Sequence, residues 1–169
     1  SYTSKSRNLI SPIFDDLFCN GNPIITSSVV LRKDILISVK KMSEDKDLTA
    51  AEDFDTWLKI AKVTEKFFLL KKPLGYYLSS KDSFWSLDKI DIRQNFLRID
   101  KILKNHLNDY NKDINNIIWA DYLKAQYLSK NSEYSDSNHY LLILIKKNIS
   151  FIMLMKIIFY FFKNVLRIK

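Results

Sequence analysis

The sequence predicts an α/β protein with a few strands and helices in its first half and a mainly α-helical second half. Residues 24–31 form a β-branched run that is typical of a buried strand. From Leu87 onward, apolar residues recur with the 3.6-residue period of a helix. Only two glycines and three prolines occur in 169 residues, too few for an all-β sandwich with many tight turns.

The remaining elements are predicted from the same two signals, β-branched runs for strands and the 3.6-residue apolar period for helices. In chain order, we expect a short helix after Pro12, helices over 34–41 and 52–63, strands over 67–70 and 74–78, helical stripes between 92 and 125, a loop over 130–138 and a last helix over 150–168. The change from mixed to helical patterning predicts a domain over residues 1–86 and a helical extension over residues 87–169.

The positive charge is concentrated at the end of the chain. The net charge is +8, and residues 138–169, which we call the basic tail, hold six basic residues and no acidic one. The residues before the tail are nearly neutral, which disfavours a nucleic-acid groove and favours an anionic membrane surface as the partner of residues 150–168. Packing of the last helix on the preceding helices is an equal alternative. The single cysteine, Cys19, has no internal disulfide partner, so a reduced, cytoplasmic setting is expected.

An acidic pair, Glu52 and Asp53, stands at the start of the helix predicted over 52–63. The apolar face of that helix follows at i, i+3, i+4 and i+7: Phe54, Trp57, Leu58 and Ala61. Free N–H groups of a first helical turn stabilise ionised carboxylates, and a carboxylate on a rigid element is a candidate general base. The alternative is structural, because acidic residues commonly begin helices for stability alone.

Other chemical signatures are lacking in the sequence. We find no P-loop, no glycine-rich dinucleotide turn, no zinc spacing and no nucleophile elbow. We interpret His106 and His139 as solvated residues on helical surfaces, and we assign no metal ligand to this chain.

Three segments, in order, resemble those of inverting family 2 glycosyltransferases of the bacterial surface-polysaccharide kind. Residues 20–33 hold an Asn-rich turn followed by Thr-Ser-Ser and the predicted strand. Residues 51–61 hold the acidic helix start, and residues 68–77 include Pro-Leu-Gly-Tyr-Tyr. The resemblance covers residues 8–80 and implies the C-terminal, acceptor-side half of a GT-A-type (nucleotide-diphospho-sugar transferase) fold.

The resemblance also implies site residues. Asp53 would be the general base, and Glu52 would contact the acceptor or the base. Trp57 would form a wall of the acceptor site, with a position in the core as an equal alternative.

The resemblance places a further loop beside the donor sugar. Its residues here are Thr26, Ser27 and Ser28, preceded by Asn22 in the Asn-rich turn. Ordinary hydrogen bonding at the start of a strand is the structural alternative for the three hydroxyl residues.

In this family, the nucleotide and a divalent metal are bound by an N-terminal half that ends in an Asp-x-Asp motif. The sequence lacks that half, so we expect Mg²⁺ or Mn²⁺ to be bound mainly there and this chain to be an inactive fragment by itself. Asp45-Lys46-Asp47 and Asp53-Phe54-Asp55 follow no apolar strand, so neither is taken as the metal motif. The Gly-Gly that usually precedes the acidic loop is Lys40-Lys41, which we expect to change only a turn.

The whole enzyme is therefore expected to transfer a sugar from a nucleotide-sugar donor to a glycan or lipid-linked acceptor in cell-envelope polysaccharide synthesis. We expect it in the cytoplasm, peripheral to the inner face of the cell membrane. The alternative is a non-enzymatic helical module that docks on an anionic membrane surface. A nucleic-acid binder is the weakest interpretation, because it requires clustered basic residues outside the tail.

Overall fold

The computed structural model of the chain describes residues 7–72, 75, 92–110, 112–113, 115 and 117–167. The chain forms two compact units. The first unit comprises residues 1–17 and 23–106, and the second comprises residues 18–22 and 107–169. The first helix, α1 (Ile13–Asn20), begins in the first unit and ends in the second. The predicted domain boundary near residue 86 lies outside the described residues.

In its described residues, the first unit contains three further α-helices and two short 3₁₀ turns. They are η1 (Thr26–Ser28), α2 (Lys33–Ser38), η2 (Lys46–Leu48), α3 (Glu52–Ala61) and α4 (Ile92–His106). The short helix after Pro12 and the helices predicted over 34–41 and 52–63 are thus confirmed. The core of this unit forms because the apolar stripe of α3 is buried together with apolar residues from α1 and α4: Phe14, Leu17, Trp57, Leu58, Phe96 and Ile102.

The prediction of an α/β fold was wrong, because the described residues are helical and contain no strand. The backbone beside Thr26 is extended at Ile25 and at Val29, as β-branched residues prefer. Between these two residues, however, the Ser28 and Val29 N–H groups donate to the Ile25 and Thr26 carbonyls and close the turn η1. A strand needs a neighbouring strand for its N–H and C=O groups, and no described segment supplies one.

The strand predicted over 67–70 is also absent. Phe67 N–H donates to the Glu65 carbonyl in a local turn, and Phe68 is 89% exposed. The strand predicted over 74–78 lies outside the described residues, apart from Gly75.

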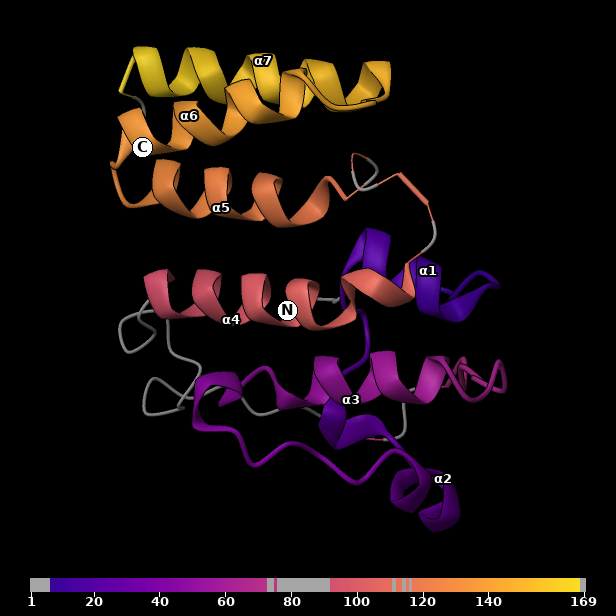
Figure 1. The fold of residues 1–169 in the computed structure, drawn as a ribbon. Helices are drawn as coiled ribbons and strands as arrows, with labels where there is room; N and C mark the ends of the chain where they lie inside the picture. Colours follow the sequence, from indigo (N-terminus) through magenta and orange to yellow (C-terminus); the bar gives the residue numbers. More distant parts are fainter. Residues whose placement is uncertain are drawn as a thin grey trace. The chain divides into compact units, whose positions relative to one another are not determined.

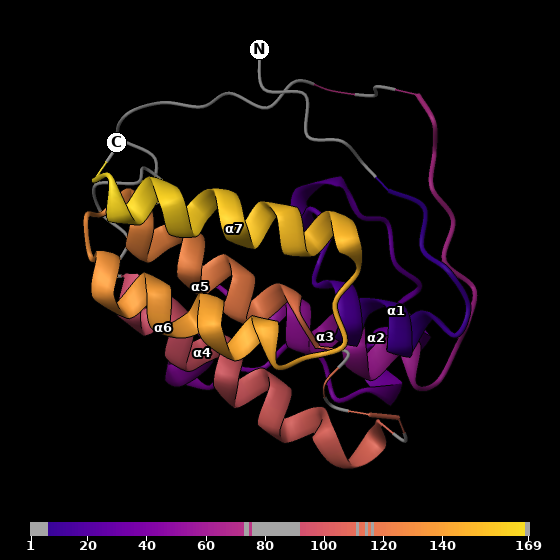
Figure 2. The same ribbon diagram turned by 90° about the horizontal axis from the view of Figure 1, so that it is seen from above.

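The second unit is a stack of three helices joined by short turns, α5 (Trp119–Lys130), α6 (Tyr134–Ile145) and α7 (Phe151–Val165), preceded by the 3₁₀ turn η3 (Leu107–Asp109). Figure 1 shows α6 between α5 and α7, and in Figure 2 α7 lies in front of the other two helices. Ala125, Leu141, Leu144 and Ile157 form its fully buried centre. The last helix was predicted over 150–168 and is confirmed, whereas the loop predicted over 130–138 is shorter because α6 begins at Tyr134.

The end of α1 joins the second unit through specific contacts. Trp119 Nε1–H donates to the Phe18 carbonyl at 2.9 Å, and Cys19 Sγ–H donates to the Tyr110 hydroxyl at 3.0 Å. Gly21 then turns the chain with φ +79°, and a Cβ at this position would lie 3.1 Å from the Trp119 ring. Glycine suits this position because it tolerates both the positive φ and the close approach of the ring.

Candidate functional site

The candidate site is built on the first turn of α3, in the first unit. Glu52, Asp53 and Asp55 all lie in this turn, and Ala51 at the N-cap offers no side chain to cap it. The N–H groups of the turn lack intrahelical acceptors, so they favour carboxylates. Asp53 supplies one such acceptor, since its Oδ1 accepts the Phe54 N–H at 2.6 Å.

Asp53 also pairs with a residue far away in the sequence. Thr26 Oγ1–H, at the start of η1, donates to Asp53 Oδ2 at 2.6 Å. The structure therefore brings together the first and second segments of the family resemblance. An ionised carboxylate has about four lone-pair positions, so Asp53 retains acceptor capacity beyond these two hydrogen bonds.

The other hydroxyl residues of η1 differ in their roles. Ser28 Oγ–H donates to the Ile25 carbonyl at 2.7 Å, which stabilises the turn itself. Ser27 is exposed and lies between the two residues that hold the turn in place. Asn22 belongs to the second unit, whereas Thr26 and Asp53 belong to the first.

Glu52 lies beside Asp53 with its side chain half-buried. Its Oε2 atom is buried and has no hydrogen-bond partner among the described residues. Leaving a buried carboxylate oxygen without a donor is costly, so this atom does not contribute to the stability of the helix start.

Trp57 takes the core position that the sequence left open. It is 4% exposed and packs in the apolar stripe of α3. Its Nε1–H is buried without an acceptor among the described residues. The indole ring therefore lies in the core on the buried face of α3 and does not line the surface beside Asp53.

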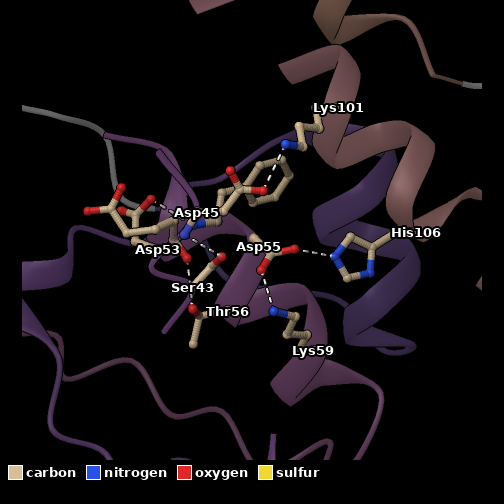
Figure 3. Close-up of polar contacts among 10 residues, drawn as sticks. Ser43, Asp45, Asp53, Asp55, Thr56, Lys59, Lys101 and His106 are labelled. Atoms are coloured by element: carbon tan, nitrogen blue, oxygen red, sulfur yellow. Dashed lines mark hydrogen bonds and ion pairs between the residues drawn. The ribbon is translucent and has the colours of Figure 1, made fainter. Parts of the chain in front are cut away.

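A buried network of polar contacts in the first unit centres on Asp55, which we did not assign to the site from the sequence. Figure 3 shows its carboxylate between His106 at the end of α4 and Lys59 one turn later on α3. His106 Nε2 lies 2.8 Å from Oδ1, and Lys59 Nζ lies 2.5 Å from Oδ2. Asp55 and His106 are each 2% exposed, so the interpretation of His106 as a solvated residue was wrong.

The chemistry of the Asp55 contact follows from its surroundings. Burial alone raises the pKa of the Asp55 carboxyl, but the hydrogen bonds and positive charges of His106 and Lys59 outweigh burial, so the pKa is lowered. Asp55 is therefore ionised at neutral pH and accepts only, which requires His106 to donate its Nε2–H. This network joins α3 to α4 and fixes the helix that carries Asp53.

A sequence signal for His106 existed in the helical period. His106 follows Ile102 by four residues and so lies on the buried face of α4, where Ile102 is fully buried. A histidine at the end of an apolar stripe needs a buried polar partner, and Asp55 is that partner.

The acidic loop before α3 is neutralised by one lysine. Lys101 Nζ on α4 lies 2.7 Å from Asp45 Oδ2 and 2.8 Å from Asp47 Oδ2. The hydrogen bond from Lys101, together with the Asp47 N–H, lowers the pKa of Asp45. In the described part of the chain, no three His, Cys, Asp or Glu side chains lie together in a way that could hold a metal ion.

Comparisons of this chain with protein-family models, with curated proteins and with solved structures gave no match. The candidate site therefore stands on its residues and their geometry.

Proposed function

We propose that this chain is the acceptor-side part of an inverting sugar transferase, with Asp53 as the general base. The observation that carries the proposal is the Thr26–Asp53 hydrogen bond, because it joins two separate segments of the family resemblance at one half-buried carboxylate. The α/β fold expected from the resemblance is not part of this proposal.

The reaction makes modest demands on this side of the enzyme. The acceptor hydroxyl oxygen forms a bond to the anomeric carbon of the donor sugar, and the bond from that carbon to the diphosphate oxygen breaks. Asp53 takes the hydroxyl proton, while the nucleoside diphosphate leaves with the bonding electron pair. A divalent metal bound by donor-side residues would offset the charge of this leaving group.

Each polar contact then has a role in the proposed site. Thr26 fixes the rotamer of Asp53, so that the carboxylate faces one direction. The exposed part of the half-buried Glu52 side chain provides an acceptor for a second hydroxyl of the sugar that is to be extended. The buried Asp55–His106 pair, joined at 2.8 Å, holds α3 rigid beneath both residues.

The proposed substrates are a nucleotide sugar as the donor and a glycan or a lipid-linked glycan as the acceptor. Nucleotide sugars are made in the cytoplasm, so the proposed place of action is the cytoplasmic face of the cell envelope.

An acceptor titration tests the proposal on the chain as it stands. Oligosaccharides released from cell-surface glycans are titrated into the protein, and binding is followed by ligand-observed NMR. We expect binding that weakens at least about tenfold in Glu52→Gln, because a hydrogen bond to a charged group is lost. Asp45→Asn is the matched control, since Asp45 is ionised and exposed nearby but is paired with Lys101. Equal binding by the Glu52→Gln and wild-type proteins would contradict the proposed acceptor site.

A further inference from the structure

We propose that the outer face of α7 docks on an anionic lipid surface, with the helix lying parallel to that surface. We use the term outer face for six apolar residues of this region: Phe151, Ile152, Met155, Phe159, Phe162 and Leu166. This inference is independent of the proposed function, because no residue near Asp53 takes part in it.

The orientation of α7 is fixed by its inner side. Ile157 is fully buried in the centre of the helical stack. Asn164, 2% exposed, accepts from Ser129 Oγ–H and donates Nδ2–H to Ser137 Oγ at 2.8 Å and to Asn138 Oδ1 at 2.7 Å. Gln126 Nε2–H donates to the Tyr160 hydroxyl at 3.1 Å. These contacts hold one side of the helix against α5 and α6 and turn the other side outward.

The outer face exposes large apolar side chains along the whole helix. Phe151 is 75% exposed, Ile152 70%, Phe159 65% and Phe162 63%. From Ile152 these residues recur every three or four positions, and Phe151 lies one turn before Met155, so the six form one continuous face. A depression on this face is lined by Phe151, Ile152, Met155, Lys156, Phe159 and Tyr160. A continuous apolar face of this kind marks an interaction site.

Basic residues along the outer face indicate which partner binds there. Lys156 is exposed and Lys163 half-buried; the two lie seven residues apart along one edge of the outer face, and exposed Arg167 follows the end of the helix. No acidic residue occurs in the basic tail. An apolar face with a basic edge fits the boundary between acyl chains and anionic headgroups. A second copy of the chain would bring the same basic residues together with no acidic partner in the tail, which disfavours self-association.

The length of α7 fits a surface helix. Its 15 residues extend about 22 Å, less than the roughly 30 Å of a hydrocarbon core. No helix in the described ranges is both long and apolar enough to cross a membrane.

Vesicle flotation tests the docking surface. The protein is mixed with vesicles of phosphatidylcholine alone or of phosphatidylcholine with about one-third phosphatidylglycerol, in low and in high salt. We expect binding to the anionic vesicles at least about tenfold stronger than to the neutral ones, and weaker in high salt. Phe159→Gln/Phe162→Gln should lower binding at least about tenfold, because two anchoring side chains are lost.

Charge reversal tests the basic edge separately. Lys156→Glu/Lys163→Glu/Arg167→Glu should abolish the preference for anionic vesicles. The controls are Phe68→Gln, at a more exposed aromatic residue of the first unit, and Lys33→Glu/Lys40→Glu/Lys41→Glu, at three exposed lysines of that unit. Both controls should bind as the wild type does, and circular dichroism should show that every variant is folded.

Three outcomes would overturn the proposal. The first is a wild-type protein that does not float with anionic vesicles. The second is binding that both α7 variants retain in full. The third is a wild-type dimer in light scattering that Phe159→Gln/Phe162→Gln converts to a monomer, which would assign the outer face to a second copy of the chain.

Discussion

Thr26 Oγ1 and Asp53 Oδ2 lie 2.6 Å apart, although 27 residues separate them in the sequence. The contact joins the 3₁₀ turn η1, which begins at Thr26, to the first turn of α3, which begins at Glu52, one residue before Asp53. This hydrogen bond orients the carboxylate that we propose as the general base.

The first prediction concerns Thr26 as a positioning residue. Thr26→Val keeps the shape of the side chain but removes the hydroxyl donor to Asp53. We expect the proposed sugar transfer, measured with the product of the whole reading frame, to slow about tenfold, through kcat rather than KM, because the proposed base loses its preferred orientation. Thr49→Val, the same change at an exposed threonine whose hydroxyl donates to the Lys46 carbonyl, should leave both constants unchanged. An unchanged kcat in Thr26→Val would show that the hydrogen bond does not position the base.

The second prediction concerns the buried pair of Asp55 and His106. Asp55→Ala removes the acceptor of both His106 and Lys59 inside the core. We expect the free energy of unfolding to fall by about 3 kcal/mol, because buried donors are left without a partner. Denaturant unfolding measures this change. Asp34→Ala breaks the exposed Arg32–Asp34 ion pair and is the control that should not move the unfolding midpoint.

The third prediction is a pH dependence with a definite sign. The pKa of Asp55 is lowered in the folded state, since hydrogen bonds from His106 and Lys59 outweigh the effect of burial. The unfolded chain therefore binds a proton on this carboxyl at a higher pH than the folded chain does. The resulting stabilisation is present above the ordinary aspartate pKa of about 4 and is lost as the pH falls through the folded value. Asp55→Asn should flatten the acid limb of the stability curve, and an identical limb in both proteins would contradict this origin.

The fourth prediction concerns two consecutive lysines, Lys40 and Lys41, at the end of α2. Lys40 and Lys41 both have φ +64°. Lys40 N–H donates to the Ile37 carbonyl and Lys41 N–H to the Leu36 carbonyl, a glycine-type C-terminal cap of α2. Lys40→Gly should raise the free energy of unfolding by about 1 kcal/mol, because glycine has no left-handed penalty. Lys33→Gly, in the first turn of α2, should lower it instead.

The helices could be predicted from the sequence because their signal is local. In α3, the positions of Phe54 and Leu58 four residues apart define a buried face without knowledge of the rest of the fold. Ser150 before α7 is a similar case, since its Oγ accepts the Met153 N–H as an N-cap residue does.

The strands could not be predicted in this way, because a strand depends on a neighbour. Residues 24–31 have strand propensity, and Ile25 and Val29 do adopt extended backbone. The hydroxyl of Ser28 and the N–H groups of the turn instead satisfy carbonyls within the segment. Propensity therefore described the local backbone correctly but not the pairing.

In the candidate site, too, local features could be predicted and contacts between distant residues could not. Glu52 and Asp53 were found because a helix start has a sequence signature, and Thr26 because of the family resemblance. The partnership of Asp55 with His106 was missed, since 51 residues separate the two and neither belongs to a motif. Only the packing of α3 against α4 brings them together.

The central claim is that Asp53 takes the proton from the acceptor hydroxyl. The most direct measurement is sugar transfer by the full-length product of the reading frame that encodes this chain, supplied with nucleotide sugars and with lipid-linked glycans from membranes. We predict that Asp53→Asn lowers kcat at least about 100-fold, as expected for the loss of a general base, whereas Asp45→Asn retains the wild-type rate. Transfer by Asp53→Asn at the wild-type rate would contradict the claim and leave Asp53 as a residue that only stabilises the start of α3.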